Sequence, residues 1–542
     1  MRSFLWTTLT LGAIIALPLL LRRGDAPSLG ASSRRLVVIT ANNEALRHET
    51  ELAFREYYAS RHGGEEVSID WRTPGGTSEI VRFLRSTFQA NARHAWSSQG
   101  DGACVPWSEE LSAAMFGGAC PEEEGLARAW HWLRESQVGV DVDVFLGGGQ
   151  YDHEGLRRSG LLVPAGVRER HPEWFAGEEP ILSPGGGGEI WYDPHDCYYA
   201  VCFATFGIVF NRDRLAQAGF SPEEIQVFGA RWSDLADPRL YRAVGLADPS
   251  QSGSITKCFE MLIQKEMQET LAARYPGLPA ESLAPTPQEL EEAWGAAMTL
   301  LKKLGGNAAY LTFSASKVPV DAATGQIAAG MCIDFYGRAQ AEWERSQLGR
   351  ETIAFRTPAA ASTVSADPVA ILRGAPHREL AEEFVDFLLS PQAQRLWGKR
   401  AGTPGGPRDY TLYRLPVRRD MYEGAELVGT VFGEERPFEL AEHFRYRGDW
   451  TGRLFSAIRV LVKVMLIDCG PELREAWGKI LEQGGLEAIS PEAAEAFRQL
   501  PFPYREAAQA TRTLESPQEE ATLRRGWIQF FRQHYRQAAA RP

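Results

Sequence analysis

Residues 36–40 read LVVIT and residues 41–44, which follow directly, read ANNE, and these two segments decide the fold. An unbroken apolar run of this length is typical of a parallel strand buried on both faces. The polar residues then begin a helix, in which Phe54 and Tyr58 lie one turn apart on the same face. The order strand, loop, helix predicts an α/β protein.

The same unit recurs twice further along the chain. Residues 67–71 (VSIDW) lead into the turn PGGTS at 74–78 and a helix, and residues 143–146 (DVFL) lead into three glycines. Open α/β sheets bind ligands where the carboxyl ends of strands meet the amino ends of helices. We therefore predict ligand contacts from these three loops, namely by Asn42, Asn43, Glu44, Gly76, Thr77, Ser78, Gly147, Gly148 and Gly149.

A second α/β region begins after an apolar, β-prone segment at 201–211. Residues 244–247 (VGLA) lead into DPSQSGS at 248–254, and a helix follows. Serine hydroxyls and free backbone N–H groups at a helix start suit an anion, which predicts ligand contacts by Ser250, Ser252, Gly253 and Ser254. Helix capping alone would explain one of these serines without a ligand.

The chain then returns to the first region through a predicted strand at 363–372. Two crossings between two lobes predict a hinged clamshell with the ligand at the interface. The predicted organisation is an N-terminal signal or anchor helix at 1–35, lobe I at 36–205 and 366–430 with a helical insertion at about 86–138, lobe II at 206–365, and a C-terminal helical extension at 431–542 that packs on the lobes.

Several further positions are candidate contacts. A strand at 331–335 is predicted to deliver Asp334 and Tyr336 to a turn at Gly337. Arg338 can pair bidentately with a carboxylate or phosphate, or it is a surface charge at a helix start. Tyr199 follows an aromatic-rich stretch and is predicted to form part of the cleft wall.

The amino-terminal segment is the main targeting signal. Residues 4–21 are apolar and lie between Arg2 and the pair Arg22-Arg23. The run is long enough to cross a bilayer and lacks a clear cleavage site, which favours an uncleaved helix tethering an exported protein to the inner membrane. Release into the periplasm after signal cleavage is the alternative.

The composition limits the kinds of binding partner that the chain is expected to have. A formal net charge of -12 without a basic run argues against nucleic acid as a partner.

The seven cysteines have no metal-site spacing. Outside the cytosol Cys104 with Cys120, or Cys197 with Cys202, could pair, and buried free thiols are the other interpretation. The run of four glycines at 185–188 predicts a mobile loop. We expect a monomer.

The chain resembles a known family through several segments taken in order. These segments are NNE at 42–44, GGTS at 75–78, DVFLGGG at 143–149, FGIVFN at 206–211, WSDLADP at 232–238 and FLLSP at 387–391. Over residues 36–397 the chain resembles bacterial extracellular solute-binding proteins of the type II periplasmic-binding fold, in the branch of the ferric-ion-binding proteins. The resemblance implies a non-enzymatic clamshell, with no obligatory cofactor, that delivers a small solute to an ABC-type permease.

The resemblance also bears on the solute. Ferric-binding relatives use two adjacent tyrosines and often a histidine; here Phe335-Tyr336 occupies the tyrosine pair and Glu44 falls near the histidine. If the solute is Fe(3+), the resemblance implies Glu44, Asp334 and Tyr336 as its ligands. The missing phenolate favours either an altered iron site or an organic or phosphorylated solute, held by the serine and threonine side chains and Arg338.

Other classes of function stay open. The sequence has no H-E-x-x-H, G-x-S-x-G or P-loop motif, so it does not indicate catalysis. A hydrolase or lyase built on the same clamshell is one alternative, because fold does not fix function. A membrane-tethered sensor that closes on its solute and signals to a membrane partner is the other.

Overall fold

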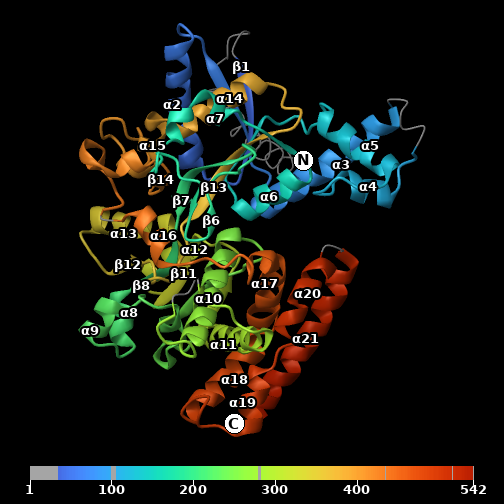
Figure 1. The fold of residues 1–542 in the computed structure, drawn as a ribbon. Helices are drawn as coiled ribbons and strands as arrows, with labels where there is room; N and C mark the ends of the chain where they lie inside the picture. Colours follow the sequence, from blue (N-terminus) through green and yellow to red (C-terminus); the bar gives the residue numbers. More distant parts are fainter. Residues whose placement is uncertain (1–33, 99–104, 279–281, 434, 515–516, 541–542) are drawn as a thin grey trace, which may run out of the picture.

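A computed structural model describes residues 34–98, 105–278, 282–433, 435–514 and 517–540. Two α/β lobes lie one above the other, as Figure 1 shows, and helices α3, α4 and α5 project from the upper lobe. Helices α17 to α21 lie along the lower lobe. The predicted α/β class is confirmed by a separate mixed sheet in each lobe.

Lobe I is built on a 7-stranded sheet in the order β14-β7-β13-β3-β1-β2, with β4 paired to β13. The strands are β1 (Arg34–Thr40), β2 (Val67–Arg72), β3 (Val144–Leu146), β4 (Leu162–Val163), β7 (Tyr199–Ala204), β13 (Ser365–Leu372) and β14 (Leu415–Pro416). Strand β1 runs parallel to β2 and β3. Its apolar run is buried because alternate residues face opposite sides: Val38 belongs to the same core as Phe54, and Ile39 belongs to a second core with Leu84.

Helices cover both faces of this sheet. They are α2 (Glu44–Arg61), α3 (Thr77–Ser98), α4 (Glu109–Met115), α5 (Glu124–Glu135), α6 (Gln150–Arg158), α7 (Val167–Arg170), α14 (Arg378–Leu389) and α15 (Pro391–Gly398). The stretch between β2 and β3 is helical, and Trp96 on α3 makes an edge contact with Trp132 on α5 at 5.0 Å between ring centroids. The projecting helices are therefore packed on one another through aromatic residues.

Lobe II is built on a 5-stranded sheet in the order β10-β9-β11-β8-β12. Its strands are β8 (Phe206–Asn211), β9 (Val244–Ala247), β10 (Ala308–Thr312), β11 (Ala329–Ile333) and β12 (Ile353–Arg356). Its helices are α8 (Arg212–Gln217), α9 (Pro222–Val227), α10 (Gly253–Ala272), α11 (Pro287–Gly306), α12 (Lys317–Ala323) and α13 (Asp334–Leu348). Ser252 caps α10 by accepting a hydrogen bond from the Ile255 N–H at 3.4 Å.

The chain crosses between the lobes at more places than the sequence predicts. One crossing is Thr205, between β7 and β8, and another is the segment 357–364, between β12 and β13. The hydroxyl oxygens of Thr205 and Thr357 lie 3.0 Å apart, which links these two crossings. A third crossing follows α16 (Pro437–His443): Ala441 belongs to the core of lobe I, whereas Phe444 belongs to the core of lobe II. The predicted count of two crossings is therefore wrong.

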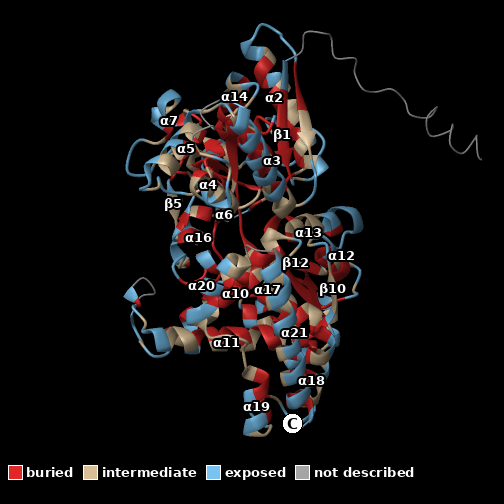
Figure 2. Cartoon of the chain, turned by 90° about the vertical axis from the view of Figure 1, so that its right-hand side faces the viewer, coloured by how far each residue is buried: buried red, intermediate tan, exposed pale blue. Residues whose placement is uncertain are grey.

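Beyond this third crossing the chain is helical and shares the core of lobe II. Its helices are α17 (Phe455–Val462), α18 (Gly470–Glu482), α19 (Pro491–Arg498), α20 (Ala507–Thr513) and α21 (Pro517–Ala540), and α17 continues into a π-helical segment at Lys463–Asp468. Trp477 on α18 packs on Gly306 of α11 and donates a hydrogen bond to Asn307 Oδ1 at 2.9 Å. Figure 2 shows α18, α19 and α21 each with a buried and an exposed side.

The local structure bears on three of the predictions. The glycine run forms a hairpin of β5 (Gly185–Gly186) and β6 (Glu189–Ile190) rather than a mobile loop. Gly337 lies inside α13 rather than in a turn, and the Phe355 ring occupies the space that a side chain at this position would need. The described cysteines are free thiols, so Cys197 and Cys202 do not pair; Cys104 lies outside the described residues.

The predicted membrane segment at residues 4–21 also lies outside the described residues. Among the residues that the structure does describe, no helix combines the length and the apolar character needed to span a bilayer.

Candidate functional site

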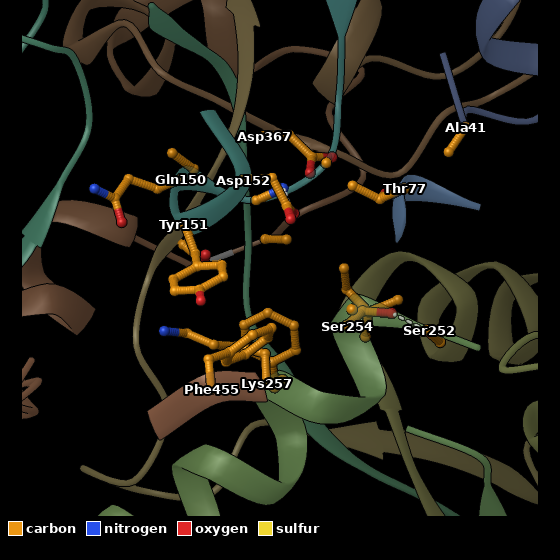
Figure 3. A pocket seen from close by; sticks show the side chains of 18 of the residues that line it. Ala41, Thr77, Gln150, Tyr151, Asp152, Ser252, Ser254, Lys257, Asp367 and Phe455 are labelled. Carbon is orange, nitrogen blue, oxygen red and sulfur yellow. Dashed lines mark hydrogen bonds between the residues drawn. The ribbon is translucent and has the colours of Figure 1, made fainter. Parts of the chain in front are cut away.

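A cavity of about 760 Å³ lies between the lobes. Loops after β1, β2 and β3 of lobe I and after β9 of lobe II face it, as predicted from the strand ends. The turn at Gly76 closely approaches the serine loop of lobe II, since a Cβ at Gly76 would lie 3.4 Å from the Gln251 backbone oxygen. Figure 3 shows Thr77 of lobe I opposite Ser252 and Ser254 of lobe II.

Polar groups without protein partners line this part of the cavity. The side-chain amide of Asn42 and the hydroxyl of Thr77 make no hydrogen bond to any other described residue. The Ser254 hydroxyl contacts only that of Ser252, at 3.0 Å. Helices α3 and α10 both begin here, and their free N–H groups and positive amino-terminal ends favour a negative charge.

Two glycines make room for these side chains. Gly147 and Gly148 have φ angles of +87° and +89°, in the left-handed region that favours glycine. A Cβ at Gly147 would lie 2.7 Å from the Asn42 side-chain nitrogen, and one at Gly148 would lie 2.8 Å from Cγ2 of Thr77. The glycines after β3 therefore let Asn42 and Thr77 enter the cavity.

A buried arginine that sequence reasoning missed lies where the lobes meet. Arg414 lines the cavity at 5% exposure and donates from Nη1 to Asp367 Oδ2 at 2.7 Å. Its guanidinium lies 3.6 Å from the ring centroid of Phe335, on lobe II. Burial raises the pKa of Asp367, and the Arg414 charge counteracts this. No motif marks Arg414, because it lies in an irregular segment between α15 and β14.

A charged network joins three parts of the chain beside the cavity. Lys257 on α10 lies 2.9 Å from Glu189 of the β5-β6 hairpin and 3.0 Å from Glu260. The Tyr446 and Thr451 hydroxyls donate to Glu260 at 2.8 and 2.6 Å. Burial opposes the charge on Lys257, but the two carboxylates outweigh it and hold its pKa well above the ordinary value. Glu189 and Glu260 are thus already engaged in ion pairs with Lys257.

The structure brings many of the predicted contacts together at the cavity. Those that line it are Asn42, Asn43, Gly76, Thr77, Gly148, Gly149, Ser252, Gly253, Ser254 and Tyr336. Those that do not line it are Glu44, Ser78, Gly147, Tyr199, Ser250, Asp334 and Arg338. The first group comes mainly from strand ends that meet at the interface, where the geometry of the sheets is strongly constrained.

The residues outside the cavity have other roles in the fold. Tyr199 is buried in the core of lobe I, 5.7 Å from the Tyr192 ring. Ser250 donates its backbone N–H to Asp248 in a turn, at 2.7 Å. Ser78 accepts a hydrogen bond from Arg459 at 3.0 Å. Glu44 is exposed in the first turn of α2.

Arg338 and Asp334 form an internal ion pair rather than a ligand site. Arg338 pairs with Glu435 and lies 3.6 Å from Asp334, which is fully buried at the start of α13. Burial raises the pKa of Asp334 to about 6, although Arg338 lowers it. Arg338, predicted to contact a solute, therefore does not line this cavity, and its guanidinium pairs with Glu435, which is remote in sequence.

The iron ligand set is likewise not assembled, since only Tyr336 of Glu44, Asp334 and Tyr336 lines the cavity. Burial also raises the pKa of Tyr336, which disfavours the phenolate. Within the described ranges, the group of His, Cys, Asp and Glu residues close enough to hold a metal is His48, Glu49 and Asp409. There Glu49 accepts backbone hydrogen bonds from residues 408–410, so its carboxylate already serves to hold that loop.

The C-terminal helical part contributes a wall that the sequence did not predict. The lining residues from it are Tyr446, Gly448, Gly452, Arg453 and Phe455. Lobe I adds Arg85, Tyr151 and Asp152, which all follow the predicted loops in the sequence. Helical spacing could have suggested Arg85, two turns into α3, but nothing local in the sequence places residues 446–455 beside the cleft.

Part of the chain is similar in sequence to known proteins. Residues 189–415 match the family described as "Bacterial extracellular solute-binding protein", which confirms the resemblance inferred from the sequence. The phosphoglycerate transport regulatory protein PgtC of Salmonella typhimurium is 26% identical over 300 residues; the match covers 51% of this chain and 65% of that relative.

Two solved structures are also similar. The periplasmic binding protein AfuA of Actinobacillus pleuropneumoniae, with fructose-6-phosphate bound, is 17% identical, with a TM-score of 0.46 over 79% of this chain and 98% of that one. Iron-bound HitA of Pseudomonas aeruginosa is 13% identical, with a TM-score of 0.44 over 79% and 99%.

Proposed function

We propose that the chain is the solute-binding component of an ABC-type importer and captures a small anionic, phosphate-bearing solute between its two lobes. The observation that carries this proposal is the interlobe cavity, where hydrogen-bond donors from both lobes converge without protein partners. Contacts to both lobes at once would stabilise the closed arrangement, so binding and hinge closure are linked.

Several features favour an anion over ferric iron. The donors without a protein partner are the side-chain amide of Asn42, the hydroxyl of Thr77 and the first N–H groups of α10. Ferric iron instead needs anionic oxygen ligands. The carboxylates that line the cavity are Asp152, Glu154, Glu189 and Asp367, and each already accepts a hydrogen bond or forms an ion pair. Donors are therefore available to a solute, whereas acceptors are largely committed.

The curated relative supports the same class of solute. Its name refers to phosphoglycerate transport. Because the match covers only 65% of that relative, phosphoglycerate enters as a test solute for this chain rather than as an assigned one. The proposed setting is extracytoplasmic, with a membrane permease as partner, as in the matched family of extracellular solute-binding proteins.

The proposal is tested by removing single hydroxyls from opposite walls. Thr77→Val keeps the side-chain shape, and Ser254→Ala leaves the Ser252 cap intact. Each lost hydrogen bond to a charged group is worth about 1.5 kcal/mol or more, so the affinity for 3-phosphoglycerate or glycerol 3-phosphate, measured by calorimetry, should fall about tenfold in each variant.

Ser86→Ala is the matched control. Ser86 is exposed on α3, and its hydroxyl donates to Phe83 O at 3.1 Å, outside the cavity. The Ser86→Ala variant should bind these solutes with the affinity of the wild type. Binding of ferric iron with a tyrosinate-to-iron absorption band, together with no binding of phosphate-bearing solutes, would refute the anion proposal.

A regulatory role is the second candidate. The word "regulatory" in the relative's name favours a receptor that closes on solute and signals to a membrane partner. The two candidates share the solute site and differ in the partner. Purification of the solute-loaded protein from membranes distinguishes them: recovery of a permease supports import, and recovery of a signalling protein without a permease supports regulation.

A further inference from the structure

The cavity has a third wall, which we call the C-terminal wall: Tyr446, Gly448, Gly452, Arg453 and Phe455. Hydrogen bonds to α10 hold it in place, because Gln264 Nε2 donates to Arg447 O at 2.9 Å and to Thr451 Oγ1 at 2.6 Å. The Tyr504 hydroxyl also donates to Trp450 O at 2.8 Å. Leu454, next to Arg453, is 2% exposed in the core of lobe II. The wall is therefore a fixed part of lobe II.

The C-terminal wall also reaches lobe I. The rings of Phe455 and Tyr151 lie 5.3 Å apart, and Arg459, one turn further along α17, donates to Ser78 at 3.0 Å. In Figure 3, Tyr151 and Phe455 lie on one side of the cavity, whereas Thr77, Ser252 and Ser254 lie on the other. A solute held at the helix starts would thus extend toward the C-terminal wall.

The charges that line the cavity are unequally satisfied. Arg158 pairs with Glu154, Lys257 with Glu189, and Arg414 with Asp367. In contrast, Arg85 and Arg453 make no hydrogen bond or ion pair with any described residue. Arg85 is near enough to Asp152 to counteract the rise that burial causes in the pKa of that carboxyl. The unsatisfied charges of the cavity are therefore guanidinium groups.

Arg453 lies near Asp449 and helps to lower the pKa of that carboxyl, but it forms no ion pair or hydrogen bond with it. It lies in a short 3-10 turn, Gly452–Leu454, whose neighbours Thr451 and Leu454 are buried. Its own side chain is exposed where it lines the cavity, so an entering solute meets it without displacing a protein partner. A planar guanidinium with parallel donors suits a carboxylate bound through both oxygens.

We infer that Arg453 of the C-terminal wall binds a carboxylate of the solute, so that the site selects phosphate-bearing solutes that also carry a carboxylate. The inference rests on the proposed function for the phosphate end and adds a specificity-determining residue for the other end. Arg85 contributes to the same positive field from lobe I.

The test compares two solutes that differ at one group. In 3-phosphoglycerate a carboxylate stands where glycerol 3-phosphate has a hydroxymethyl group. We expect the wild type to bind 3-phosphoglycerate at least about tenfold more tightly. In Arg453→Gln this preference should fall to about twofold or less, with the affinity for glycerol 3-phosphate unchanged. Calorimetry gives both constants, and thermal unfolding without solute verifies folding.

Arg505→Gln is the matched control, because it removes the same charge from the C-terminal helical part at a side chain that is 78% exposed and does not line the cavity. It should keep the wild-type preference. An equal loss of both affinities in Arg453→Gln, or no preference in the wild type, overturns the inference and leaves the phosphate site standing. Failure of the wild type to bind either solute overturns the proposed function itself.

Discussion

Arg414 and Asp367 place a buried and a half-buried charge side by side where the lobes meet. Asp367 lies on β13, Arg414 precedes β14, and the Phe335 ring under the guanidinium belongs to lobe II. Breaking such a pair leaves an uncompensated buried charge, which is much more costly than replacing both partners. Arg414 donates to Asp367 from one nitrogen, Nη1, so the pair leaves guanidinium donors for the cavity that it lines.

Burial of the His153 side chain makes the stability of the folded protein depend on pH. It is fully buried, stacks on Phe145 at 4.5 Å, and its surroundings contain no charged partner that shifts it. Burial lowers its pKa from 6.5 to about 4. The unfolded chain therefore takes up a proton near pH 6.5 before the folded protein does, and this group contributes stability above pH 6.5 that is lost as pH falls to 4.

The loss amounts to about 3 kcal/mol across that window. His153→Gln should remove this part of the pH dependence, as measured by urea unfolding at pH 7 and pH 4.5. His94→Gln, at an exposed position on α3, is the control and should behave as the wild type. The same acid sensitivity in His153→Gln and wild type would show that burial of this imidazole is not the cause.

At the scale of elements, the β5-β6 hairpin shows how glycines allow close backbone approach. Gly187 and Gly188 have positive φ angles, and the hairpin rests on residues 441–446. The Tyr446 N–H donates to Gly187 O at 2.5 Å, and the adjacent Glu189 pairs with Lys257. A short element that looks flexible in sequence therefore connects lobe I, lobe II and the C-terminal wall.

Gly188→Ala should destabilise the protein more than the backbone strain alone explains. A Cβ at Gly188 would lie 2.2 Å from Tyr446 O, so the hairpin or the wall must shift, at a cost of about 2 kcal/mol beyond the strain. Gly177→Ala is matched in φ (+96° against +90°) but meets nothing within 4 Å, and should cost about 1 kcal/mol. Equal losses in the two variants, measured by urea unfolding, would contradict the packing argument.

At the scale of the whole molecule, the C-terminal helices are part of lobe II rather than an attachment to it. Residues from α17 to α21 share one core with β8, β9 and α11. Arg459 and Phe455 then connect this combined unit to lobe I. Any opening of the cleft must therefore separate Ser78 from Arg459 and Tyr151 from Phe455, so the C-terminal wall moves as part of lobe II.

Removal of residues 444–542 should consequently prevent lobe II from folding. The deletion would expose the side of α11 on which Trp477 packs, together with the buried residues around it. We expect a shortened chain that is insoluble or lacks a cooperative thermal transition, as followed by circular dichroism. Supplying residues 444–542 as a separate chain should restore solubility. A soluble truncated chain with a cooperative transition would show that the extension is dispensable.

Local sequence patterns were sufficient to predict the α/β class and several of the loops that line the cavity. Asn42, Thr77, Gly148 and Ser252 could be found because strand periodicity and helix starts are local properties, and α/β sheets place such loops at one edge. The partners of individual side chains, in contrast, depend on the folding of the whole chain: Glu435 pairs with Arg338, Asp367 pairs with Arg414, and residues 446–455 form a third wall of the cavity. These contacts join segments far apart in the chain, and no local pattern encodes which side chain meets which across a core.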